Sequence, residues 1–358
     1  MFAEMGRQSS TLVKAALSTL KWTGAAGALA PLTGGIGAIF CLQHVAPEPP
    51  RAFAPNRHRT ITPAFLDATI RTVLAQGFDI LSMDGVQRRI AEGNFDRPFA
   101  AFTFDGGTRD ILQHAYPTFL HYNVPFAIYV ASDFADGTGD YWWVKLEKAI
   151  AALDAVELKM YGTWSRIVCG TTAQKYRAFE TVETWLRTLP EADVRAIVSD
   201  LCRLNGVGVD GLCAELAMNW TELRALARDP LVTIAAQSRG HWALARLEPA
   251  SARQEMASGR TRLATEIGRP CHHFSYPYGD ETSAGTREFE MAQELGFATG
   301  VTTRAGLLHA GDVDGLMALP RLALDGRLQK TRYVSVMLSG APFALRDRAE
   351  RRSRRAAA

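Results

Sequence analysis

Short apolar runs that alternate with helical patterns constrain the fold of this chain more than any other feature of its sequence. Continuously apolar strands joined by helices are typical of parallel strands buried on both faces. Such strands occur in (β/α) barrels and in doubly wound α/β sheets, and the pattern alone leaves both folds open. The seven runs span residues 37–45, 78–83, 98–104, 125–131, 231–236, 271–276 and 297–302.

The segments between the runs carry helix signals. Thr62 and Pro63 form a pair suited to the N-cap and first turn of a helix. A short helix is expected to end at Gly93, because glycine readily adopts the left-handed conformation that ends helices. Long helical patterns at 248–267 and 285–295 separate the last three runs.

Three regions depart from this rhythm. Residues 141–228 are predicted to be a mostly helical insertion between two strands. The N-terminal extension, 1–36, is predicted to hold an amphipathic helix at about 10–21 and then a loop. The arginine-rich tail, 341–358, is expected to be a solvated, disordered extension. The main domain therefore spans residues 37–340.

The five cysteines form no Cys-x-x-Cys pair. An odd number without such a pair argues against a disulfide framework and against a structural zinc site. We expect reduced, mostly buried thiols in a cytoplasmic protein. With 47% hydrophobic residues, the 358-residue chain has enough apolar surface for a sizeable core and is not disordered.

Membrane spanning and nucleic-acid binding are both poorly supported. Lys21, Pro31 and several glycines interrupt the N-terminal apolar stretch, so no unbroken run of about 18 apolar residues exists. Acidic Glu4 and a late, glycine-rich apolar region do not resemble a signal peptide. Peripheral membrane contact through the N-terminal helix stays an open alternative. The basic tail contains Asp347 and Glu350 and lacks interleaved aromatic residues, which disfavours nucleic acid as a partner.

Polar side chains follow several of the predicted strands. The carboxyl ends of parallel strands meet on one rim, where sites of α/β folds lie. Each residue alone has a structural explanation, since Asp before Gly is common in turns and a lone His is usually structural. Their shared position favours a site built from Gln43, His44, Asp105, Gln237, His241 and Tyr278.

Three motifs lie at these strand ends: TFDGG at 103–107, QSRGH at 237–241 and FSYPYG at 274–279. Their order and spacing, with further matches at Tyr141-Trp142-Trp143, 296–306 and Leu319-Pro320-Arg321, resemble the NodB-type polysaccharide deacetylases, the carbohydrate esterase 4 family. The resemblance covers residues 37–328. It implies an α/β fold, a deformed (β/α)7 barrel with a helical insertion, that acts on N-acetylated oligo- or polysaccharides.

The resemblance also implies roles for individual residues. Asp105 matches the general base, and Arg321 matches an arginine that orients the catalytic carboxylate. The turn at Tyr278 is expected to supply a backbone N–H to the developing oxyanion. The general-acid histidine of the family has no clear match, and His309 corresponds to it by rough position only.

The metal-binding motifs depart from the family pattern. The family implies a divalent metal, zinc or similar, and the ligand positions hold Gly106, Gln237 and His241. Glycine offers no ligand, and a neutral amide oxygen replaces an imidazole poorly. One good ligand is left where a catalytic site typically has three. Without a metal to lower it, the pKa of a water molecule stays far above neutral, so Asp105 has little hydroxide to generate.

Two hypotheses follow. The first is a sugar de-N-acetylase with metal-assisted acid/base catalysis, whose missing ligands are replaced by other residues. The second is an impaired relative that binds carbohydrate without turnover, with Trp143, Trp242 and Tyr278 packing against sugar rings. A cytoplasmic location favours a lipid-linked or oligosaccharide precursor. The candidate replacement ligands, each more simply explained as structural, are His44, Asp110, His272, His273 and His309.

Overall fold

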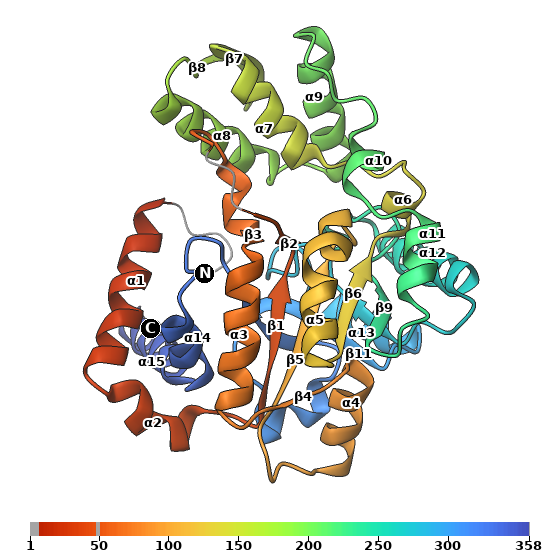
Figure 1. Ribbon diagram of the computed structural model, residues 1–358. Helices are drawn as coiled ribbons and strands as arrows, with labels where there is room; N and C mark the ends of the chain where they lie inside the picture. Colours follow the sequence, from red (N-terminus) through yellow and green to blue (C-terminus); the bar gives the residue numbers. More distant parts are fainter. Residues whose placement is uncertain (1–6, 48–50, 358) are drawn as a thin grey trace.

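Seven parallel strands close into a barrel in the computed structural model, which describes residues 7–47 and 51–357 (Figure 1). The ring closes because β1 pairs with both β12 and β5, while the short strand β4 adds to the other edge of β5 outside the ring. This confirms the expected (β/α)7 barrel and excludes an open doubly wound sheet. Around the barrel the strands are β1 (Gly37–Leu42), β12 (Leu319–Ala323), β11 (Thr299–Ala305), β10 (His273–Ser275), β9 (Val232–Ala236), β6 (Phe126–Val130) and β5 (Phe99–Asp105).

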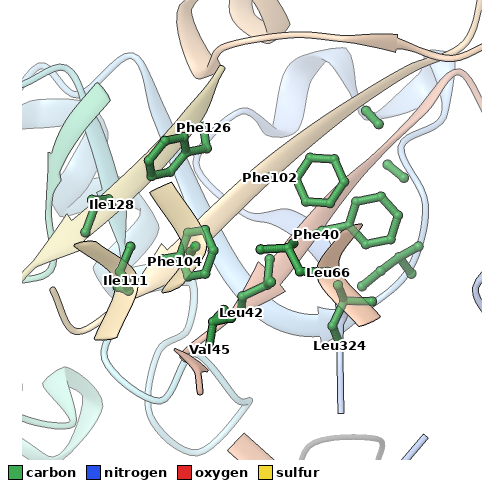
Figure 2. Close-up of a cluster of buried hydrophobic side chains, with 14 of the residues drawn as sticks. Phe40, Leu42, Val45, Leu66, Phe102, Phe104, Ile111, Phe126, Ile128 and Leu324 are labelled. Carbon is green, nitrogen blue, oxygen red and sulfur yellow. The ribbon is translucent and has the colours of Figure 1, made fainter. Parts of the chain in front are cut away.

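Strand residues alternate between two cores. Phe102 packs on Phe119 of the outer helix α5 (Tyr116–Tyr122), and the same outer cluster includes Phe40 and Phe126 (Figure 2). The intervening residues form the interior of the barrel, a separate cluster that includes Tyr129. Strands buried on both faces need the continuous apolar runs seen in the sequence.

The predicted helices are present with their caps. Thr62 caps α3 (Pro63–Ala75), its hydroxyl accepting from the backbone of Phe65. The helix α4 (Met83–Glu92) ends at Gly93, which is left-handed. The expected strand at 78–83 is reduced to β4 (Asp79–Ile80), because α4 begins early. The long patterns form α12 (Pro249–Ile267) and α13 (Thr286–Glu294).

The segment between β6 and β9 covers the carboxyl end of the barrel and has its own apolar core (Figure 1). A mostly helical segment was expected, and the structure adds an antiparallel hairpin that the sequence reasoning missed. The turn of this hairpin needs left-handed backbone at Tyr161 and Gly162. The elements are α6 (Ser132–Ala135), α7 (Trp142–Ala152), β7 (Ala155–Met160), β8 (Thr163–Val168), α8 (Thr172–Leu186), α9 (Glu191–Leu204), α10 (Leu212–Leu216) and α11 (Trp220–Leu226).

At both ends of the chain, the structure differs in part from what the sequence predicts. The helix α1 (Arg7–Trp22) is as predicted, whereas the loop expected after it is a second helix, α2 (Ala25–Thr33). The tail expected to be disordered forms α15 (Ala341–Ala357), anchored by buried Phe343 beside α14 (Thr331–Leu338). Glu4 lies outside the described residues. In residues 7–47 and 51–357, no helix combines the length and apolar character needed to span a membrane.

Short elements complete the description. Strand β2 (His44–Val45) pairs with β3 (Thr60–Ile61), and this small parallel pair lies just after the end of β1. The 3₁₀ turn η1 (Pro55–Arg59) leads into β3. All five cysteines are free and buried, as expected.

Candidate functional site

A pocket of about 120 Å³ opens at the carboxyl end of the barrel, below the segment between β6 and β9. It brings together most of the predicted site residues, although their motifs are far apart in the sequence. The predicted residues that line it are Gln43, His44, Asp105, Gly106, Tyr141, Trp143, Gln237, His241 and Tyr278.

Asp105 ends β5 and is held by Arg321 of β12. The guanidinium donates to Asp105 Oδ1 at 2.9 Å and to Oδ2 at 2.7 Å. The hydroxyl of Ser275 adds a bond to Oδ1 at 3.0 Å, and the thiol of Cys41 lies 3.5 Å from Oδ2. Arg321 also donates to the carbonyl of Thr302 at 2.7 Å. Both carboxylate oxygens of Asp105 are therefore engaged by protein groups.

Burial and charge act in opposite directions on this cluster. Burial alone lowers the pKa of Arg321, but the adjacent Asp105 carboxylate outweighs it and raises that pKa above its ordinary value. Burial raises the pKa of the Cys41 thiol, with Arg321 partly opposing the shift. Cys41 therefore stays a neutral thiol beside a fully formed ion pair.

Gln237 and His241 leave two polar atoms unsatisfied in the pocket. Gln237 is 1% exposed and His241 8% exposed, so both are shielded from water. Neither Gln237 Oε1 nor His241 Nδ1 has a hydrogen-bond partner among the described residues. Burial, followed by the charge of Arg195, lowers the pKa of His241 to about 3, so its imidazole is neutral. Buried polar atoms without protein partners are uncommon, so these two atoms are available to a polar group of a ligand or to water.

The residues at the metal positions do not fit a divalent metal. Gly106 has a φ of +100°, a conformation that residues with a side chain rarely adopt, so the backbone itself differs from what an aspartate needs. Gln237 contributes only an amide. Within the described part of the chain, no group of three His, Cys, Asp or Glu side chains is arranged to hold a metal ion. The donor set is thus one imidazole, one amide and one carboxylate already paired with arginine.

Tyr278 forms one wall of the pocket in a left-handed conformation, with φ of 61°. Its hydroxyl accepts a hydrogen bond from Trp142 Nε1 at 2.8 Å, and the guanidinium of Arg187 stands 4.9 Å from its ring centre. Burial raises the pKa of Tyr278 to about 12, so its phenol stays protonated. The backbone N–H of Tyr278 donates no hydrogen bond within the described residues.

Aromatic rings surround the imidazole of His241. Phe134 stacks on it at 5.7 Å, and the rings of Trp143 and Tyr278 lie 5.5 Å and 5.0 Å away. Trp242 lies outside the pocket lining, with the guanidinium of Arg195 5.0 Å from its ring.

The candidate replacement ligands do not gather at this site. His44 lines the pocket, but its Nδ1 lies 3.3 Å from Asp110, whose carboxylate also accepts from the backbone of Val45. His273 is buried at the start of β10, bonded to Thr299 and Asp84. The remaining two, His272 and His309, are exposed and do not line the pocket.

Several residues of the site were missed by sequence reasoning. Cys41 reaches Asp105 from the adjacent strand β1 and Ser275 from the more distant β10. The alternation of these residues with outward-facing ones was the available signal. Arg59 and Arg187 line the pocket from segments without a recognised motif, and Asp280 binds Arg187 at 2.5 Å. These long-range contacts leave no local trace in the sequence.

Comparisons with known proteins give structural matches only. No protein-family model and no curated protein sequence matches the chain. The solved deacetylase PplD of Streptococcus pyogenes, in complex with acetate, superposes with a TM-score of 0.57 at 14% identity, over 84% of this chain and 97% of that one.

Two further structures agree. IcaB from Ammonifex degensii matches with a TM-score of 0.53 at 13% identity, covering 85% of this chain and 97% of its own. BC0361, a polysaccharide deacetylase from Bacillus cereus, matches with a TM-score of 0.53 at 11% identity, over 84% of this chain and 68% of its own. Identities this low establish shared architecture. The chain therefore has the fold of the NodB-type polysaccharide deacetylases, a deformed seven-stranded (β/α) barrel.

Proposed function

We propose that the pocket at the barrel mouth binds an N-acetylated amino sugar, as a unit of an oligo- or polysaccharide, and does not hydrolyse it by the metal-assisted route. The fold supports a carbohydrate ligand, and the donor set at Gly106, Gln237 and His241 argues against a bound catalytic metal. The protein is then a deacetylase-like member of the fold that binds sugar without a catalytic metal site.

The observation that carries this proposal is the pair of unsatisfied atoms, Gln237 Oε1 and His241 Nδ1, in one aromatic pocket. An acetamido group brings an N–H donor for the glutamine oxygen. Its carbonyl is an acceptor for a neutral imidazole N–H, if His241 carries its proton on Nδ1. Satisfying buried polar atoms contributes to binding because leaving them unpaired is costly.

The aromatic walls suit the rest of the sugar. Trp143 is 5% exposed and lines the pocket beside Tyr278, so both present ring carbon to a ligand. The apolar faces of sugar rings pack against such surfaces. Trp242 lies outside the lining, and we assign it to the support of Arg195 and not to direct contact.

Calorimetric titration with tri-N-acetylglucosamine tests this proposal, with the fully deacetylated glucosamine trimer as the control ligand. We expect only the acetylated trimer to bind, and we expect the variants Gln237→Leu and Trp143→Ala each to weaken binding by about 10-fold or more. Equal binding of both trimers, or no effect of Gln237→Leu in a folded variant, would overturn the role of the acetamido group.

Hydrolysis is the second candidate function. The positions of Asp105 and Arg321, and the unpaired backbone N–H of Tyr278, favour it, since these groups match the expected base, its orienting partner and an oxyanion donor. The matching assay measures acetate release from the same trimer with zinc, cobalt or manganese supplied. Turnover that disappears in Asp105→Asn would establish this second function.

We further propose that the protein is cytoplasmic and contacts a membrane peripherally. This contact would bring the pocket close to a lipid-linked sugar precursor. Leu12, Trp22 and Leu32, on α1 and α2, are 73%, 78% and 84% exposed. Sedimentation with anionic vesicles, compared with the variant Trp22→Ser/Leu32→Ser, tests the contact. Equal sedimentation of both proteins would contradict it.

A further inference from the structure

Arg59 is an incompletely paired cation in the wall of the same pocket. It is the last residue of η1, and its side chain is 15% exposed. Its Nε has no hydrogen-bond partner among the described residues. The nearest carboxylate oxygen, Glu183 Oε1, lies 4.0 Å away, which is beyond hydrogen-bond length. The guanidinium stands 5.3 Å from the ring centre of Trp143, which fixes its position at the wall.

The carboxylates that line the pocket do not neutralise Arg59, because each is held at hydrogen-bond distance by another arginine. The three pairs, with the shortest distance in each, are Asp105 with Arg321 at 2.7 Å, Asp280 with Arg187 at 2.5 Å and Asp325 with Arg327 at 2.5 Å.

The neighbouring His58 is neutral, so it neither adds to this charge nor competes for an anion. Burial is the main cause that lowers its pKa to about 4. Burial also lowers the pKa of Arg59, but arginine remains protonated in proteins. The pocket is therefore left with one positive charge that the described residues do not pair closely.

We infer that the ligand of this pocket carries an anionic group, a phosphate or a carboxylate, which Arg59 binds. This inference rests on the proposed function, because the anion is a substituent of the sugar held by Gln237 and Trp143. A guanidinium matches the oxygens of both anions with paired N–H donors. A buried charge is costly unless it is paired, and the anion supplies the missing partner.

Calorimetry with four probes tests the inference: N-acetylglucosamine, N-acetylglucosamine 1-phosphate, N-acetylmuramic acid and inorganic phosphate. Each is titrated into the unmodified protein and into Arg59→Gln, Arg59→Lys and the control Arg166→Gln, which changes an arginine that is 66% exposed on β8. We expect at least one anionic sugar to bind about 10- to 100-fold more tightly than the neutral sugar. Arg59→Gln should abolish that difference, and Arg59→Lys should keep part of it.

Each outcome separates the inference from the proposed function. If the neutral sugar binds and neither anionic sugar binds more tightly, or if Arg59→Gln leaves the difference intact, the anion site is wrong and the sugar site stands. If inorganic phosphate binds as tightly as the sugar phosphate and the neutral sugar does not bind, the anion site stands and the sugar site falls. A preference between the phosphate and the carboxylate sugar identifies the anion. The comparison in the unmodified protein decides the inference even if Arg59→Gln does not fold.

Discussion

The guanidinium of Arg321 donates hydrogen bonds to both carboxylate oxygens of Asp105 inside the barrel, at 2.9 Å and 2.7 Å. Arg321 is on β12 and Asp105 on β5, the two strands that flank β1. The ion pair therefore spans the point where the barrel closes. Ser275 of β10 contacts both members of the pair. Asp105 is thus a structural anchor of the barrel as well as the candidate base.

Removing one member of this pair should be strongly destabilising. Arg321→Met leaves Asp105 buried without its counter-charge, and we expect a loss of about 3–5 kcal/mol in the free energy of unfolding. Denaturant unfolding measures it, with Arg166→Gln as an exposed control expected to change stability by less than about 0.5 kcal/mol. A loss for Arg321→Met no larger than the control's would show that the pair does not hold the barrel closed.

The neutral His241 should make the protein less stable in mild acid. Its pKa is about 3 in the folded protein and about 6.5 in an exposed chain, so between these values the unfolded state binds the extra proton. The contribution of neutral His241 to the free energy of unfolding is complete above pH 6.5 and is lost as the pH falls toward 3. At about 1.4 kcal/mol per pH unit, the loss reaches about 3 kcal/mol near pH 4.5.

The comparison protein is His241→Asn, because asparagine tolerates the left-handed backbone at this position, where φ is 56°. Unfolding free energies are measured for both proteins from pH 8 to about 4, where the shift at His58 is common to both. We expect the unmodified protein to lose more stability than the variant. If the unfolding free energies of the two proteins fall equally with pH, His241 takes up its proton in the folded state as well.

An aspartate at position 106, where the NodB-type motif that this chain resembles has one, should cost stability. In Gly106→Asp the new side chain has open space, since the nearest atom to an added Cβ is 3.9 Å away, on Thr108. The cost comes from the backbone at φ +100° and should be about 1–3 kcal/mol. Gly208→Asp, at an exposed glycine without positive φ, is the matched control. Equal stability of both variants would show that the backbone conformation at position 106 accepts a residue with a side chain at no cost.

The cysteines should resist thiol reagents in the folded protein. All five are buried, and burial raises the pKa of Cys271 to about 11 and that of Cys41 further. Thiolates are the reactive species, so colorimetric labelling should be slow until denaturant is added and should then reach all five thiols. Rapid labelling of Cys41, which lines the pocket, would indicate a mouth that opens more widely than the structure shows.

The repeating pattern of the barrel was predictable because its signals are local. Strands such as 98–104 are apolar on both faces, and the cap at Thr62 and the stop at Gly93 depend on neighbouring residues only. The strand β12 was not predicted as a strand, since Pro320 and Arg321 within it are not typical of a buried strand. Arg321 is tolerated there because Asp105, far away in the sequence, pairs with it.

The contrast between local signals and contacts made by residues far apart in the sequence also explains which parts of the site were predicted. The convergence of Asp105, Gln237 and Tyr278 followed from one rule, that parallel strands end on the same rim. The helix α2 was missed because it contains Gly27 and Pro31, which normally weaken helices. The place of Arg59 in the pocket depends on how η1 packs against α7, which only the tertiary structure gives.

The metal content of the unmodified protein tests the central claim most directly. The protein is purified without chelator or nickel affinity, incubated with zinc, desalted and analysed by mass spectrometry, and its binding of tri-N-acetylglucosamine is measured on the same sample. The account predicts trimer binding without stoichiometric transition metal, because Gly106 and Gln237 supply no strong ligand. One equivalent of zinc per chain, lost in His241→Asn and accompanied by acetate release, would contradict it.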